Sequence, residues 1–74
     1  MTQHQLAQKL KEMYENAPYG EAVAHIHLFG IMYAKEIENG SYSVKDIIKY
    51  SGLKESYQTE VTKGIKLSKY VVVK

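Results

Sequence analysis

Residues 43–61 read SVKDIIKYSGLKESYQTEV, a stretch in which two helical patterns are joined at a glycine. Ser43 with Asp46 three residues later is a capping-box-like pattern, which predicts that a helix begins directly after the serine. Two isoleucines form the apolar side of this helix, and the Ser-Gly pair that follows predicts its end, because Gly52 adopts a left-handed backbone at little cost. We therefore predict a short helix over about residues 44–50.

A second helix is predicted to begin near Lys54 or Glu55 and to bury one side. Its apolar residues recur at every fourth position, which is the spacing of a single helical face. These residues are Leu53, Tyr57, Val61 and Ile65. We predict that Gly64 is the C-cap of this helix.

Two longer helices are predicted upstream, over about residues 2–16 and 21–38. The first begins with a capping box, in which Thr2 and Gln5 satisfy each other's backbone N–H groups. The second is apolar nearly all round, as expected of a central helix, and Asn39-Gly40 predicts its end. Apolar and polar residues alternate over residues 24–28 as in a strand, so residues 22–28 can be either helical or extended. If they are extended, the helix begins near Leu28.

These elements predict one mainly all-α domain over residues 1–74, a compact three- or four-helix bundle that contains a helix-turn-helix-like pair. After the last helix, Tyr70-Val71-Val72-Val73 is aromatic and β-branched. This composition predicts a short C-terminal strand or an extended tail against the bundle.

The pair over residues 43–61 resembles the helix-turn-helix family, and the whole chain is similar to small bacterial and phage helix-turn-helix-like proteins. A capped short helix, a glycine turn and a second helix anchored by Tyr57 and Val61 carry the resemblance. Where the family usually has a small residue in the middle of the first helix, this chain has Ile47 or Ile48. The resemblance implies that the outer face of the second helix enters a DNA major groove.

On that resemblance, the start and outer side of the second helix carry the DNA contacts. Gln58 is the best base reader, since its amide can pair with adenine, and Ser56 and Thr59 can contact phosphate or a thymine methyl. Glu55 can accept a hydrogen bond from the cytosine amino group. The lysines implied as contacts are Lys54 and Lys63 on the second helix, with Lys45, Lys49, Lys66 and Lys69 as phosphate contacts.

The distribution of charge agrees with an anionic partner. Residues 1–40 carry three Lys and five Glu, a net charge of −2, whereas residues 41–74 carry seven Lys, one Asp and two Glu, a net charge of +4. Such segregation indicates a face that meets negative charge, with a solvated lysine surface as the alternative. All ten basic residues are lysines, so the bidentate guanine contact of arginine is missing.

Several classes of function find no support in the chain. With no cysteine, it has no disulfide and no thiolate site. His25 and His27 are the only paired metal-ligand residues, and they point to opposite sides if that segment is helical. No phosphate-binding loop, dinucleotide-binding fingerprint or Ser/His/Asp order typical of a catalytic triad occurs.

We expect no enzyme, no cofactor, no metal and no small-molecule substrate. We also expect no signal peptide and no membrane span, and hence a cytoplasmic protein.

Seven tyrosines keep two other functions open. Tyr14, Tyr33, Tyr50 and Tyr57 fall near apolar stripes and are predicted to be core residues with a solvated hydroxyl. Tyrosine is also common at protein interfaces and stacks on single-stranded bases.

From the helix-turn-helix resemblance and the distribution of charge, we expect a small DNA-binding regulatory protein that acts as a homodimer. The alternatives are a protein–protein interaction or assembly module without nucleic acid, and an RNA- or single-strand-binding protein.

Overall fold

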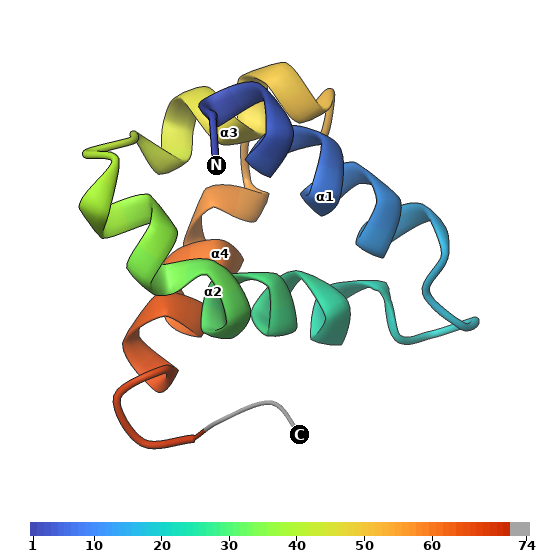
Figure 1. Ribbon diagram of the computed structural model, residues 1–74. Coiled ribbons are helices and arrows are strands. Elements are labelled where there is room, and N and C mark those ends of the chain that lie inside the picture. The colour runs from blue at the N-terminus through green and yellow to red at the C-terminus, as the bar shows by residue number, and fades with distance from the viewer. Residues whose placement is uncertain (72–74) are drawn as a thin grey trace.

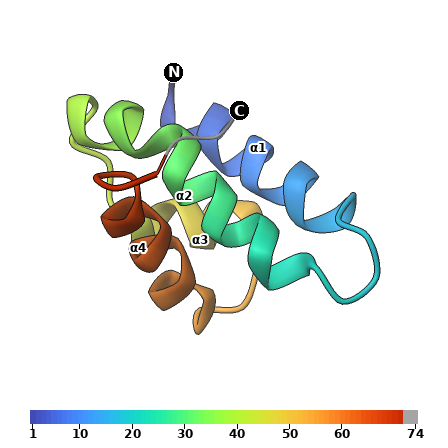
Figure 2. The ribbon, with the colours of Figure 1, turned by 90° about the horizontal axis from the view of Figure 1, so that it is seen from below.

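The computed structural model describes residues 1–71 and contains four helices (Figure 1). They are α1 (Gln3–Glu15), α2 (Ala22–Asn39), α3 (Val44–Ser51) and α4 (Tyr57–Leu67). α2 lies between α1 and α4, and α1 also packs on α3 (Figure 2). The prediction of a mainly all-α bundle of three or four helices is confirmed, with four helices in residues 1–71.

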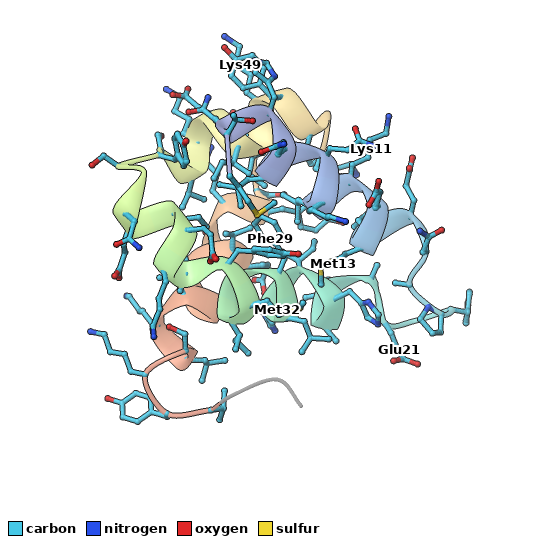
Figure 3. The ribbon with its side chains drawn as sticks, viewed as in Figure 1. Lys11, Met13, Glu21, Phe29, Met32 and Lys49 are labelled. Atoms are coloured by element: carbon cyan, nitrogen blue, oxygen red, sulfur yellow. The ribbon has the colours of Figure 1, made fainter. Side chains whose placement is uncertain are left out.

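Every helix contributes to one apolar core. The fully buried side chains are Leu6 and Leu10 from α1, Ile26 and Phe29 from α2, Ile47 and Ile48 from α3, and Val61 from α4. Phe29 is the largest of them and points into the space enclosed by the helices (Figure 3). No helix can bury its apolar stripe alone, and each stripe is covered by the other helices in this shared core.

The two predicted helix starts with side-chain caps are confirmed. The Thr2 hydroxyl accepts a hydrogen bond from the Gln5 N–H at 3.1 Å, and the Gln5 side chain accepts one from the Thr2 N–H at 2.8 Å. At α3, the Ser43 hydroxyl accepts from the Asp46 N–H at 3.4 Å.

Residues 22–28 are helical, which decides between the two interpretations of that segment. In a helix, Ile26, Phe29, Gly30, Ala34 and Ile37 fall on one side, and all of them are buried. A strand would have placed Ile26 on one face and both flanking histidines on the other, without this continuous buried stripe.

Three details differ from the sequence-based predictions. α4 begins at Tyr57 rather than at Lys54 or Glu55, which lie before it. Tyr50 is not a core residue: it is 51% exposed, and its ring packs on the ring of His4 with centroids 4.6 Å apart. The C-terminal stretch is predicted to form a short strand or an extended tail: Tyr70 lies in a turn, Val71 lies outside any helix or strand, and Val72 and Val73 lie outside the described residues. Residues 1–71 contain no strand.

The prediction that Gly64 caps α4 is wrong, because the helix continues to Leu67. Gly64 is buried where α4 crosses α2, facing Gly30. A Cβ on Gly64 would collide with the carbonyl oxygen of His27 and lie 3.0 Å from the Gly30 Cα. A Cβ on Gly30 would lie 2.5 Å from the Val61 carbonyl oxygen and 2.9 Å from the Gly64 Cα. Both glycines are therefore needed for the close approach of the two backbones.

We expect Gly64→Ala to destabilise the protein by about 1–3 kcal/mol, the range typical of overpacking. Helix propensity alone predicts the opposite sign, a gain of about 1 kcal/mol, because alanine is the better helix former. Urea denaturation distinguishes the two, with Thr59→Ala, at an exposed position of the same helix, as the matched control. A Gly64→Ala protein more stable than the wild type would contradict the close helix crossing.

Candidate nucleic-acid interface

The lysines of α3 are exposed because its isoleucines are buried. Ile47 and Ile48 pack into the core, which turns Lys45 and Lys49 outward, four residues apart on one face. Lys49 lies at one extreme of the molecule, on the opposite side from Met32 of α2 (Figure 3). α3 therefore presents two ammonium groups to solvent.

Ser51 fixes the turn between α3 and α4. Its buried hydroxyl donates a hydrogen bond to the Ile48 carbonyl at 2.7 Å and accepts one from the Leu53 N–H at 3.2 Å. Gly52 follows with a φ of 80° in the left-handed region. Sequence reasoning identified the glycine but not the part played by the serine, whose signal is a small hydroxyl residue directly before a C-cap glycine.

The approach to α4 is a hydrogen-bonded turn. The Tyr57 N–H donates to the Lys54 carbonyl at 3.0 Å, and the Gln58 N–H donates to the Glu55 carbonyl at 3.1 Å. Lys54, Glu55 and Ser56 are all exposed on this turn.

The inner side of α4 sets which of its residues face solvent. Val61 is buried, and the Tyr57 hydroxyl lies 3.3 Å from the Tyr14 hydroxyl of α1. Thr59 and Lys63 are consequently exposed, and Gln58 is half-buried at the edge. The outward direction predicted for the first two and the flanking position of Gln58 are confirmed.

A groove of about 280 Å³ separates α3 from the start of α4. It is lined by Lys45, Ile48, Lys49, Leu53, Glu55 and Gln58. Four of the ten residues predicted as DNA contacts thus come together there. Ile47 or Ile48 stands at the position where the helix-turn-helix pattern has a small residue, and Ile48 forms part of the groove wall.

The remaining predicted contacts divide into two groups. Lys54, Ser56 and Thr59 lie in the sequence between or beside groove residues. Lys63 and Lys66 instead line a separate depression at the far end of α4, and Lys69 follows that helix. The structure therefore does not gather all ten residues at a single site.

Glu60 is a charged residue that sequence reasoning did not single out. Its Oε2 lies 2.5 Å from Nε2 of His27 on α2, and its Oε1 accepts from the Lys63 ammonium at 3.4 Å. The hydrogen bond from His27 is the main cause that lowers the pKa of Glu60. The carboxylate therefore links α4 to α2.

His27 and His25 do not form a paired site. His27 contacts Glu60, whereas His25 lines a depression between α1 and α2. Among residues 1–71, no three metal-ligating side chains come together. No helix in that part of the chain has the length and apolar character required to cross a membrane.

A family model described as an HTH-like domain matches residues 2–74. No curated protein and no solved structure matches the chain.

The Glu60 contacts predict a dependence of stability on pH. A carboxyl group whose pKa is lower in the folded than in the unfolded protein stabilises the fold above its unfolded pKa, and that stabilisation is lost as the pH falls through its folded pKa. For Glu60 the loss is expected below its usual pKa of 4.5. Urea denaturation at several pH values should show that Glu60→Gln loses less free energy of unfolding than the wild type over this acid range.

Glu38→Gln is the matched control, because it removes the same charge from an exposed position of α2. It should keep the acid dependence of the wild type. A Glu60→Gln protein with an unchanged acid dependence would show that the contact with His27 does not stabilise the fold.

Proposed function

We propose that this chain, which belongs to the HTH-like domain family, is a small regulatory protein that binds duplex DNA with the face formed by α3 and the start of α4. The groove between these helices is the observation that carries the proposal. It sets two lysines of α3 opposite an amide side chain of α4. This combination provides charge for the phosphate backbone and a polar group for a base edge.

The residues of this face have distinct roles in the proposal. Gln58 reads the edge of a base, with adenine as its best partner. Lys45, Lys49 and Lys54 contact phosphates and orient the protein without reading sequence. Ser56 and Thr59 add hydroxyl groups, and Glu55 favours a cytosine beside the groove because its carboxylate can accept from the base amino group.

The three lysines beyond the groove extend the basic surface along α4. Lys63 lies four residues after Thr59 and shares its face, so we include it among the phosphate contacts. Lys66 and Lys69 lie further along and contact phosphate only if the duplex follows α4 beyond its middle.

Two further features belong to the proposal. Because one short helix reaches only a few base pairs, we propose that the protein binds as a homodimer, with α1 or the valine-rich C-terminal segment as the candidate self-contact. The proposed function is binding without catalysis in the bacterial cytoplasm, where DNA is accessible.

The proposal predicts specific NMR shifts on adding a mixed-sequence duplex to labelled protein at low salt. We expect shifts confined to about residues 44–63. The logarithm of the binding constant should fall with the logarithm of the salt concentration with a slope near −3 to −4, as expected for about four lysine–phosphate contacts. Gln58→Ala should reduce the preference among duplex sequences, whereas Lys49→Ala should weaken all sequences alike. Lys11→Ala removes an exposed lysine of α1 and is the matched control, expected to leave binding unchanged.

Equal losses across sequences in both Gln58→Ala and Lys49→Ala would contradict the assignment of α4 as the reading helix. An absence of shifts at about 100 μM, where non-specific binders respond, would reject DNA binding. The protein–protein assembly module would then be the leading function. A preference for single-stranded over duplex nucleic acid would favour the RNA- or single-strand-binding alternative.

A further inference from the structure

A second surface of α4 combines lysines with exposed apolar side chains. Lys63, Lys66, Leu67 and Tyr70 line a depression of about 300 Å³ at the C-terminal end of the helix, which we call the basic-apolar patch. Leu67 is 42% exposed and Tyr70 is 83% exposed. The DNA-binding face described above does not account for these two side chains.

The packing of α4 on α2 creates the patch. Val61 and Gly64 face α2, so the opposite side of α4 is free of contacts with that helix. The patch residues recur at spacings of three and four, which aligns them on one side. After Leu67, a hydrogen bond of 2.9 Å from the Tyr70 N–H to the Leu67 carbonyl continues the turn and keeps Tyr70 beside Leu67.

The patch is remote from the groove. Gln58 and Leu67 are separated by about 14 Å along the helix axis, at 1.5 Å per residue. The end of α4 and residues 68–71 after it lie away from α3 (Figure 1). A ligand of modest size on the patch therefore leaves the groove open. The patch shares only Lys63 with the four main phosphate contacts proposed above, and the inference does not rest on the proposed DNA binding.

The charge of the patch is positive. Among residues 1–71, no carboxylate lines the patch and no ion pair includes Lys66. Lys63 has Glu60 at 3.4 Å, but that carboxylate is shared with His27. The complementary partner is therefore one that presents negative charge beside apolar side chains.

We propose that the basic-apolar patch binds an acidic amphipathic peptide segment of a partner protein. Carboxylates of the peptide contact Lys63 and Lys66, and its aliphatic side chains cover Leu67 and Tyr70. This gives the chain a protein-docking surface separate from the groove. A helical segment fits, because its apolar and acidic residues also recur at spacings of three and four.

The composition of the patch favours a peptide over the other anionic partners. Leu67 is aliphatic and offers no flat face on which a base can stack, unlike the platforms of single-strand-binding proteins. An anionic membrane surface is bound by helices whose apolar face extends over many turns, whereas two side chains form the apolar part here.

The test uses labelled protein and a synthetic peptide of about 12 residues, three helical turns, in which Leu recurs at helical spacing among Glu. We expect shifts at residues 63–70 and none at residues 44–56. Leu67→Ser and Tyr70→Ser should each weaken binding about tenfold, since each removes apolar area that the peptide covers. Met32→Ser is the matched control, because Met32 is 45% exposed on α2, outside the patch, and should leave the affinity unchanged.

Three outcomes would overturn the inference. Equal binding of a peptide with Ser in place of every Leu would show that only charge attraction acts. Displacement of the peptide by single-stranded or duplex DNA, with the same shifts at Leu67 and Tyr70, would assign the patch to nucleic acid. Binding to vesicles of phosphatidylserine and phosphatidylcholine that Leu67→Ser abolishes, without peptide binding, would assign it to lipid.

Discussion

The close crossing of α2 and α4 at Gly30 and Gly64 is the contact on which the rest of the structure depends. Neither position has room for a Cβ, because backbone atoms of the other helix occupy that space. Two helices that meet backbone to backbone are held at a short distance and with little freedom to rotate. This fixes which side of α4 is buried, and therefore which of its residues reach solvent.

The position of α3 depends on the packing of large side chains and not on a close contact between backbones. Its two isoleucines are large and fully buried, and it packs on α1 more than on α4. Ser51 then ties the turn to the last residues of α3 through its two hydrogen bonds. A groove remains between α3 and the start of α4, with lysines on one side and Gln58 on the other.

α4 consequently serves two surfaces with different chemistry. Its first turns border the groove, where charge and amide groups suit a nucleic-acid duplex. Its last turn carries lysines beside Leu67 and Tyr70, a combination suited to an acidic amphipathic peptide. Between them, Glu60 contacts His27 and Lys63, so the middle of the helix is joined to α2 by charge as well as by the two glycines.

Local signals in the sequence determined the helices, the caps at Thr2 and Ser43, the turn at Gly52 and the outward side of α4, because these depend on neighbours within a few residues. The tertiary structure decided what depends on residues distant in the chain. Gly64 looked like a helix end, since its sequence neighbours do not show that Gly30 lies against it. The lysines looked like one set, yet the α2–α4 crossing assigns them to two surfaces. The role of Glu60 in joining α4 to α2 depends on His27, which lies thirty-three residues earlier in the sequence and contacts Glu60 only in the folded protein.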